Sequence, residues 1–286
     1  MTITREAYAK LNLCLEIIGK REDNYHDITS VMQLVDLSDT LTFSSSSELT
    51  LTCDSMNLAA EAGENLALKA ARLLRQASGV SEGAHITLEK RIPVAAGLGG
   101  GSSDAAAALR GLTELWGLNP GKEVLLNIAL QVGSDVPFFL AGPTALVEGR
   151  GERVTRIPSP SPGWAVLVCP QYDLRDKTKE LYSSLSRSDL SDGLATRRLI
   201  AELIAGSFPR SGLLFNAFER SASGIFDGLD RMRATVMRAS GRDVHLSGSG
   251  PTLFTLYSAR EEVHARRLHQ ALGEAGLRTF LAAIIR

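Results

Sequence analysis

Cysteine is scarce in this sequence, and the three residues present stand far apart. Cys14, Cys53 and Cys169 are odd in number and form no C-x-x-C pair. A disulfide framework usually has an even number of cysteines, and a zinc finger needs closely spaced pairs of them. The sequence therefore indicates neither of them, and we expect a protein of the reducing cytoplasm.

An excess of charge of one sign and long hydrophobic runs are also missing. The formal net charge is -1, from 31 Lys and Arg against 32 Asp and Glu, whereas nucleic-acid-binding proteins usually show a basic excess. No apolar run approaches the roughly 18 residues of a membrane span, and no apolar signal segment opens the chain. We therefore expect neither a nucleic-acid partner nor a membrane.

The chain has enough hydrophobic sequence for a sizeable core. Hydrophobic residues make up 44% of its 286 residues and charged residues 22%, a balance typical of globular proteins of one large or two ordinary domains. Alternation and apolar composition predict strands, and apolar stripes at helical spacing predict helices. The predicted strands are 3–18, 40–43, 49–53, 85–91, 164–169, two short ones around 247–251, and 279–285; the predicted helices are 65–76, 103–116, 122–131 and 259–275.

A single Pro/Ser-rich stretch, from Ile157 to Gly163, interrupts this pattern and indicates a linker. It predicts an N-terminal domain of residues 1–157 and a C-terminal domain of residues 164–286. Because strands and helices are mixed on both sides of it, the expected fold class is α+β with two domains.

The most informative segment is glycine-rich and reads Pro93-Val-Ala-Ala-Gly-Leu-Gly-Gly-Gly-Ser-Ser-Asp104. A predicted strand precedes it and an Ala-rich helix follows, with Ser102 or Ser103 expected as the helix cap and Asp104 in the first turn. Glycines let the backbone approach a ligand closely, and the amides of a helix start bind anions. The segment therefore predicts a phosphate site, although a plain flexible turn is the alternative.

Two widespread phosphate loops do not fit this segment. A P-loop needs Lys after its last glycine, and none stands here. The dinucleotide fingerprint needs a third glycine where Ser102 stands and an acidic residue about 20 positions later, where a turn at Gly117 is expected instead. A dehydrogenase is therefore not indicated.

The segment closely resembles the ATP-phosphate loop of the GHMP kinases. Ala7–Leu13 is similar to the first motif of that family, and Leu246-Ser-Gly-Ser-Gly-Pro-Thr252 is similar to its third. The resemblance implies an N-terminal domain like one found in a ribosomal protein, a ferredoxin-like C-terminal domain, and ATP as the phosphoryl donor. The residues that it implies for ATP binding are Asn65, Pro93, Val94, Ala95, Ala96, Gly97, Leu98, Gly99, Gly100, Gly101, Ser102 and Ser103.

Three further stretches resemble one branch of that family: Ala9-Lys10-Leu-Asn12-Leu, Asn24-Tyr25-His26 and Gly133-Ser-Asp135-Val-Pro. In this branch, ATP phosphorylates the tertiary 2-hydroxyl of a methylerythritol unit that carries a CDP group. The reaction belongs to the non-mevalonate route to isoprenoid precursors. The resemblance therefore implies a small-molecule kinase of this type.

Two residues carry the predicted chemistry. Asp135 is the expected general base, since phosphoryl transfer needs a carboxylate near the attacking hydroxyl; its other role is a helix N-cap before Pro137. Lys10 is expected to keep Asp135 ionised and to stabilise charge on the attacking oxygen. Without the resemblance, Lys10 would be read as an exposed strand lysine.

Four residues are the candidates for binding the acceptor. The resemblance implies that Tyr25 stacks on cytosine and that His26 hydrogen-bonds its edge, and their ring chemistry suits both tasks. Asn12 is expected to line the site. Tyr182, which keeps a family spacing from Thr178, is the expected second aromatic, although Lys177 replaces the usual Ser and Tyr172 is a substitute.

Several points stay open at this stage. Asn65 matches an adenine-reading position of the family, but a helix N-cap is the competing interpretation. Mg²⁺ is expected with ATP, and no protein ligand is assigned to it. The competing functions are a kinase for homoserine, mevalonate or a sugar, and a non-catalytic binding module. A monomer or homodimer is expected.

Overall fold

The computed structural model describes residues 2–23, 25–54, 65–172 and 177–286. The chain forms two compact units, and each is built from several stretches of sequence. Unit 1 comprises Met1–Ala9, Leu37–Val94 and Gly99–Ala141; unit 2 comprises Lys10–Asp36, Ala95–Leu98 and Gly142–Arg286. The division at residues 157 and 164 that the linker suggests stays a prediction.

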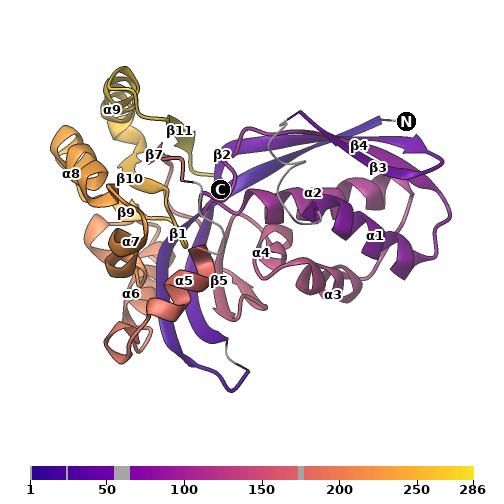
Figure 1. Cartoon of the computed structure of the whole chain (residues 1–286), viewed down its shortest axis with the longest axis horizontal. Helices are drawn as coiled ribbons and strands as arrows, with labels where there is room; N and C mark the ends of the chain where they lie inside the picture. Colours follow the sequence, from indigo (N-terminus) through magenta and orange to yellow (C-terminus); the bar gives the residue numbers. More distant parts are fainter. Residues whose placement is uncertain (1, 24, 55–64, 173–176) are drawn as a thin grey trace. The chain divides into compact units, whose positions relative to one another are not determined.

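Unit 1 is a layer of strands with helices on one face (Figure 1). The end of β2 (His26–Ser46) pairs antiparallel with β4, and β4 pairs parallel with β3. The first residues of β1 (Thr2–Lys20) also belong to this unit. Its other elements are β3 (Leu49–Cys53), α1 (Leu66–Ser78), β4 (Gly83–Glu89), α2 (Gly100–Leu115), α3 (Lys122–Val132) and α4 (Val136–Ala141).

Local sequence explains how the helices of unit 1 begin and pack. Asn65 caps α1 by accepting the amides of Ala67 and Leu68, and Gly79 ends the helix at φ +70°. Helix α2 is rich in small residues, so its backbone lies close to the sheet. Gly111, within it, faces the ring of Phe43 at a point where a Cβ would overlap the ring.

Unit 2 contains a second, antiparallel sheet in the order β11-β7-β10-β9. Helix α9 packs on this sheet and α8 packs on α9 (Figure 1). The elements are β5 (Thr144–Gly149), β6 (Arg153–Arg156), β7 (Gly163–Val168), α5 (Lys177–Ser184), α6 (Leu194–Ile204), β8 (Phe215–Asn216), α7 (Glu219–Ile225), α8 (Leu229–Ser240), β9 (His245–Leu246), β10 (Leu253–Ser258), α9 (Glu262–Glu274) and β11 (Thr279–Ala283), with short 3-10 turns at Arg187–Asp189, Ser211–Leu213 and Ala259–Glu261.

The strands β1 and β2 also contribute to unit 2. Ile28–Gln33 of β2 pairs antiparallel with β5, which continues into β6, and Cys14 and Leu15 of β1 pair parallel with β8. From Ala9 to Ile17, both faces of β1 are buried. The predicted polar face of this strand is therefore inside the protein, where its side chains need hydrogen-bond partners.

The predicted α+β class is confirmed, since helices and two sheets are present. The predicted strand at 49–53 matches β3, and the other predicted elements agree within a few residues, with three exceptions. The predicted strand at 40–43 is only the end of β2, which begins at His26. Helix α2 begins at Gly100 and not at Ser103. The residues around 247–251 form the turn between β9 and β10 and not the strands themselves.

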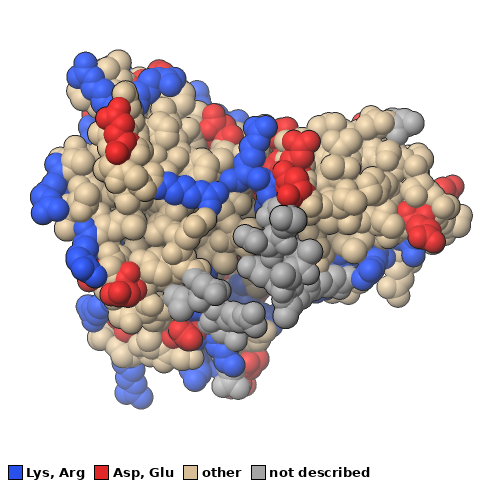
Figure 2. Space-filling model, turned by 45° about the horizontal axis from the view of Figure 1, so that its top comes forward, with Lys and Arg blue, Asp and Glu red and all other residues tan. Residues whose placement is uncertain are grey.

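Two surface properties bear on the expected partners. No helix in the described part of the chain is long and apolar enough to cross a membrane. The face in Figure 2 carries both basic and acidic side chains among the described residues, and some of the basic side chains adjoin one another.

Gly111→Ala tests how closely α2 packs in unit 1. Because the added methyl overlaps the Phe43 ring, we expect the free energy of unfolding to fall by about 1–3 kcal/mol. Urea denaturation measures it. The control is Gly224→Ala in α7, where a Cβ meets nothing within 4 Å and alanine should stabilise the helix by up to about 1 kcal/mol. Equal stability of Gly111→Ala and the unsubstituted protein would contradict this packing.

Candidate active site

The start of α2 presents unused backbone donors in unit 1. Its N-cap is Gly99, at φ +73°, and among the described residues no side chain caps the helix. Ser102 and Ser103 lie inside the helix and Asp104 lies beyond its first turn, so the predicted serine cap is wrong. Amides that no cap occupies, together with the helix dipole, favour an anion at this end.

The first half of the glycine-rich loop, Ala95–Leu98, belongs to unit 2 and is held by the third motif. Gly97 has φ +80°, and a Cβ there would overlap the carbonyl oxygen of Ser247 and lie 2.9 Å from the Gly250 nitrogen. Ser247 Oγ donates to the Gly97 carbonyl at 3.0 Å, and the Thr252 amide donates to that of Ala96 at 3.2 Å. Glycine is therefore required at position 97.

Lys10 and Asn12 lie buried beside this pair of turns. The Lys10 amide donates to the Leu98 carbonyl at 2.9 Å, and its Nζ donates to Asn12 Oδ1. Asn12 Nδ2 in turn donates to Ser30 Oγ at 2.8 Å. A Cβ on Gly248 would lie 3.0 Å from Lys10 Nζ, so the backbone of the third motif passes directly over the ammonium group. The exposed-lysine interpretation of Lys10 is wrong.

Asp135 lies in unit 1, directly before α4, and is half-buried. Its segment adjoins the start of α2, since a Cβ on Gly133 would lie 3.8 Å from Ser102 Oγ. The Val136 amide donates to the Gly133 carbonyl at 3.2 Å and closes the turn that presents Asp135. Unit 1 therefore brings the predicted base and the free helix amides into one neighbourhood.

Asn65 occupies the start of the neighbouring helix. Its Oδ1 accepts the Ala67 amide at 2.9 Å and the Leu68 amide at 3.4 Å, so the N-cap interpretation is confirmed. A Cβ on Gly101 would lie 3.5 Å from the Leu66 side chain, which places the starts of α1 and α2 side by side. The adenine-reading role that the family resemblance implies stays a prediction.

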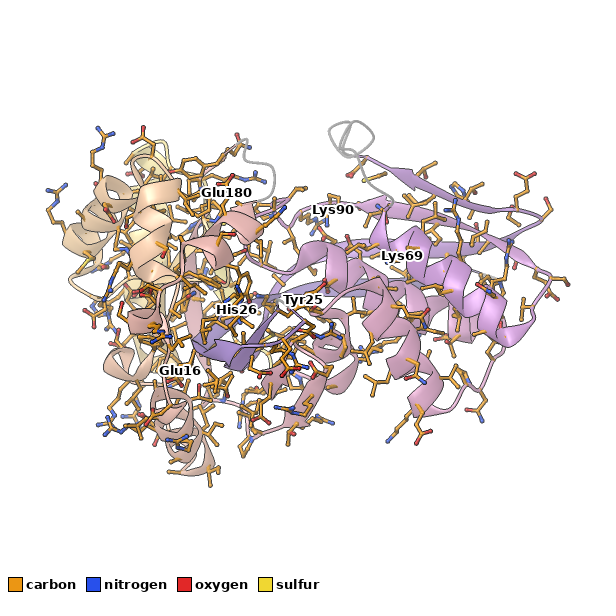
Figure 3. All side chains as sticks on the ribbon, turned by 60° about the horizontal axis from the view of Figure 1, so that its bottom comes forward. Glu16, Tyr25, His26, Lys69, Lys90 and Glu180 are labelled. Carbon is orange, nitrogen blue, oxygen red and sulfur yellow. The ribbon has the colours of Figure 1, made fainter. Side chains whose placement is uncertain are left out.

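The predicted cytosine-binding residues belong to unit 2, and two of them, His26 and Tyr182, are in contact. The rings of His26 and Tyr182 stack at 5.1 Å with an interplanar angle of 25°. Tyr25 and His26 are adjacent (Figure 3), and Tyr25 is 56% exposed with the Arg150 guanidinium 4.9 Å from its ring centroid. Burial, with a smaller contribution from Lys20, lowers the pKa of His26. Asn24, the first residue of this motif, lies outside the described residues.

The substitute aromatic, Tyr172, is engaged elsewhere. Its ring packs on Phe226 at 5.2 Å, and its hydroxyl donates to the Asp227 carbonyl at 2.7 Å. Tyr182 is the aromatic that the fold places beside His26, and it also meets Phe218 edge to face. The geometry favours Tyr182 over Tyr172 as the second aromatic.

Lys177 contacts both glycine motifs, and the sequence analysis did not single it out as a candidate site residue. It begins α5, is buried, and donates from Nζ to the carbonyls of Ala95 and Gly250. Burial, and next the charge of Lys10, lowers the pKa of Lys177 to about 8. The one signal in the sequence was its departure from the serine usual in the family at this position.

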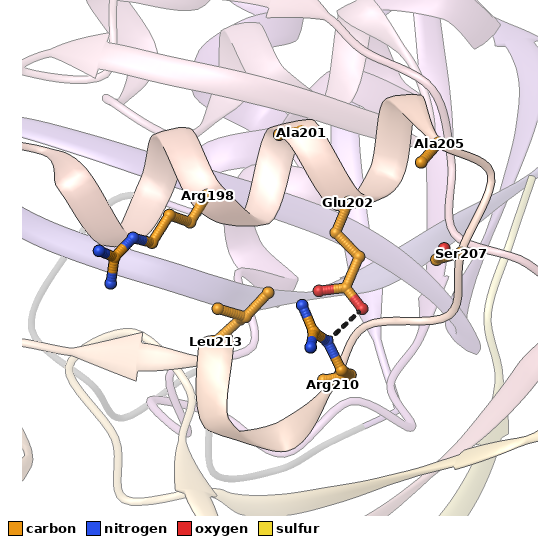
Figure 4. Close-up of a pocket in the computed structure, with 7 residues that line it drawn as sticks. All are labelled: Arg198, Ala201, Glu202, Ala205, Ser207, Arg210 and Leu213. Atoms are coloured by element: carbon orange, nitrogen blue, oxygen red, sulfur yellow. Dashed lines mark hydrogen bonds and ion pairs between the residues drawn. The ribbon is translucent and has the colours of Figure 1, made fainter.

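A groove of about 520 Å³ lies elsewhere on unit 2, along α6. Glu202 Oε1 accepts from Arg210 Nε across it at 3.1 Å (Figure 4). None of the motif residues lines this groove, so it is not the candidate active site. In the described ranges, no group of three or more His, Cys, Asp or Glu is arranged to hold a metal ion.

Comparison with known proteins agrees with this arrangement of motifs. The model of the GHMP kinases N terminal domain matches residues 65–143, which include Asn65, the whole glycine-rich segment and Asp135. Homoserine kinase from Cytophaga hutchinsonii has a similar structure, with a TM-score of 0.75, coverage of 99% of this chain and 94% of that chain, and 18% sequence identity. At that identity, the likeness shows the fold alone.

Two comparisons are closer. The 4-diphosphocytidyl-2-C-methyl-D-erythritol kinase of Dehalococcoides mccartyi is 37% identical over 284 residues, which cover 99% of this chain and 98% of that protein. The crystal structure of a 4-(cytidine 5'-diphospho)-2C-methyl-D-erythritol kinase matches with a TM-score of 0.83 and 36% identity over 99% of both chains. With both glycine motifs, the buried Lys10 and the Asp135 turn in place, the chain belongs to the 4-diphosphocytidyl-2-C-methyl-D-erythritol kinase family within the GHMP kinases.

Proposed function

We propose that this protein transfers the γ-phosphoryl group of ATP to the 2-hydroxyl of 4-(cytidine 5'-diphospho)-2-C-methyl-D-erythritol, which yields the 2-phosphate and ADP. The product enters the non-mevalonate route to isoprenoid precursors. The observation that carries the proposal is the buried Lys10, held between the glycine-rich loop and the Gly248 turn, in a chain whose full-length relatives are named as this kinase.

The triphosphate binds at the glycine-rich loop in this proposal. The uncapped amides of α2 face a negative ligand, and glycines at 97, 99, 100 and 101 leave room for it. Asn65 lies at the adjoining end of α1, where its amide nitrogen can meet the adenine edge while its oxygen caps the helix. Residues 93–103 then form the ATP site together with Asn65.

The transfer step needs a base and a positive charge. Asp135 takes the proton of the 2-hydroxyl while the hydroxyl oxygen attacks the γ-phosphorus of ATP. The bond from that phosphorus to the β,γ-bridging oxygen breaks, and this oxygen leaves with ADP. Lys10 stabilises the negative charge that develops on the attacking oxygen. Its burial strengthens this effect, because charges interact more strongly away from water.

Cytosine recognition distinguishes this acceptor from those of other GHMP kinases. Tyr25 and Tyr182 provide ring faces for stacking, and neutral His26 offers one donor and one acceptor to the base edge. Asn12 accepts from Lys10 and is the proposed polar lining of the acceptor site beside that lysine. Homoserine and mevalonate lack a base that these rings can hold.

Mg²⁺ accompanies ATP in this proposal. Mg²⁺ bound with nucleotides usually takes phosphate oxygens and water as ligands, and no residue of this chain is assigned to it. The ion supplies charge neutralisation on the phosphates. The chain's own residues orient the acceptor and move the proton.

The decisive experiment offers ATP and Mg²⁺ with four separate acceptors and follows ADP release. The acceptors are CDP-methylerythritol, methylerythritol phosphate, homoserine and mevalonate. Turnover that is restricted to the cytidine-bearing acceptor supports the proposal. Preference for an acceptor without cytidine, or turnover with none of the four, refutes it.

Asp135→Asn tests the general base. The amide keeps the shape of the carboxylate but accepts no proton, so kcat should fall by about 10²–10⁴-fold, while ATP binding measured by calorimetry stays near the unsubstituted value. Near-normal turnover of this variant would remove Asp135 from its proposed role.

Tyr182→Leu tests the second aromatic. Loss of one stacking face should raise the KM for the acceptor about tenfold, since stacking on an aromatic contributes on the order of 1–3 kcal/mol per base. The KM for ATP should not change. The matched control is Tyr172→Leu, which should lower the melting temperature and leave the acceptor KM unchanged; the reverse pattern would assign the stacking role to Tyr172.

The pH dependence of acceptor binding tests His26. Because burial lowers its pKa below the ordinary value of 6.5, the ring is neutral at pH 7 and takes up a proton only in more acidic solution. The acceptor KM should therefore stay flat from pH 8 to 6.5 and rise only in more acidic solution. His26→Gln should lose the rise. An acceptor KM that increases between pH 8 and 7 would contradict the proposal that neutral His26 binds the edge of the cytosine.

A further inference from the structure

Three buried charged side chains form a cluster in unit 1 that the proposed chemistry does not use. Lys90 donates from Nζ to Asp104 Oδ2 at 2.8 Å and to Asp39 Oδ2. The side chains of Lys90, Asp39 and Asp104 are 6%, 0% and 4% exposed. Lys90 follows the end of β4 (Figure 3), Asp39 lies in β2 and Asp104 lies in α2. Three elements thus meet at one ammonium group.

The cluster contains one more acid than base. Asp104 Oδ1 is buried and has no hydrogen-bond partner among the described residues. Burial raises the pKa of Asp104 to about 7, Asp39 adds to the rise and the charge of Lys90 opposes it. Burial also disfavours the charge of Lys90, but Asp104 and Asp39 outweigh it and raise the pKa of Lys90. A buried carboxylate in surplus reduces the stability of the folded protein.

The cluster touches the chain on both sides of the glycine-rich loop. Asp39 Oδ1 accepts the amides of Arg91 at 2.6 Å and Ile92 at 2.8 Å, immediately before Pro93. On the far side, a Cβ on Gly100 would lie 3.3 Å from Lys90 Nζ and 3.1 Å from Ile92. Asp104 lies one turn further along α2. The same three side chains therefore fix where the loop is entered and where the helix after it begins.

We propose that Asp39, Lys90 and Asp104 are positioning residues for the nucleotide. They tie the strand end before the loop to the helix after it and so hold the α2 amides in the geometry that binds phosphate. The proposal rests on the proposed function, because it assigns ATP to this loop. None of the three side chains touches the reacting atoms in this proposal.

The alternative is a cluster that only stabilises unit 1. A stabilising cluster would change the melting temperature without changing ATP affinity relative to acceptor affinity. A positioning cluster changes ATP affinity selectively, because a small shift of the α2 amides weakens every bond to the phosphates at once. The two roles therefore differ in a measurable ratio.

Asp104→Ser provides the test, because serine is too short to accept from Lys90 Nζ. We expect its Kd for ATP, measured by calorimetry with ATP alone, to rise at least tenfold, and its KM for the acceptor to stay within about twofold. Asp104→Asn keeps an oxygen for Lys90 and should restore ATP affinity to within about threefold of the unsubstituted protein. The matched control is Asp54→Ala, which removes an exposed acceptor of the Lys90 amide and should change neither constant.

The outcomes separate the hypotheses. If Asp104→Ser is folded and binds ATP normally, or if both constants rise together, the positioning role is refuted. If Asp104→Ser is unfolded, Asp104→Asn decides. If Asp104→Asn binds ATP within threefold of the unsubstituted protein, the result supports a positioning role that acts through the oxygen accepting from Lys90. A tenfold loss of ATP affinity in Asp104→Asn refutes that role. If the unsubstituted protein binds no ATP, the proposed function fails first, and the positioning proposal fails with it.

A pH series checks that the Asp104 carboxyl is the buried surplus acid. Its folded pKa of about 7 lies above the unfolded value of 3.8, so the folded state binds the extra proton between these values and the Asp104 contribution to stability falls as pH rises. The melting temperature of Asp104→Asn, relative to that of the unsubstituted protein, should therefore increase from pH 5 to 8. A constant difference would contradict the assignment.

Discussion

The backbone of Gly97 passes so close to the carbonyl of Ser247 that no side chain fits between them. The glycine-rich loop is therefore shaped in part by a turn 150 positions later in the chain. Lys10 and Asn12 depend on the same contact, because Gly248 passes over the ammonium group while Leu98 accepts the Lys10 amide. One close approach of two backbones thus sets the position of the loop, of the buried cation and of the polar residues beside it.

Buried lysines recur around this loop, and their environments differ. Lys177 donates to two backbone carbonyls, which are neutral, and its pKa is lowered to about 8. Lys90 donates to two carboxylates, and its pKa is raised. Two carboxylates keep Lys90 charged at the pH of the cell, whereas burial and the charge of Lys10 make Lys177 lose its proton more readily. Lys90 therefore adds no net positive charge for a polyanion, because the two acids that hold it outnumber it.

Much of the fold was predictable because it depends on local patterns. The alternation in 3–18 and the stripes in 65–76 and 122–131 correspond to β1, α1 and α3. The predicted start of α2 is three residues late, because glycine and serine have a low helix propensity and do not indicate a helix at 100–102. In the structure, packing against Ile92 and Leu66 overrides this low propensity. In the site, the glycine motifs, Lys10 and Asp135 were identified through family resemblance. The contacts of Lys177 and of Asp104 could not be identified from the sequence, because they join residues that are far apart in the chain and meet only after folding.

The first strand belongs to both units, with Thr2–Ala9 in unit 1 and residues 10–20 in unit 2. Unit 1 is complete once residue 141 has been synthesised, but unit 2 also needs the last residues, since the Ile285 amide donates to Leu34 and Gln33 Nε2 donates to the Ile285 carbonyl. On the ribosome, the part of β2 around Gln33 and Leu34 must therefore wait for these last residues before its hydrogen bonds are complete. Truncating them would leave a segment deep in the sequence without these partners, although it was synthesised 252 residues earlier.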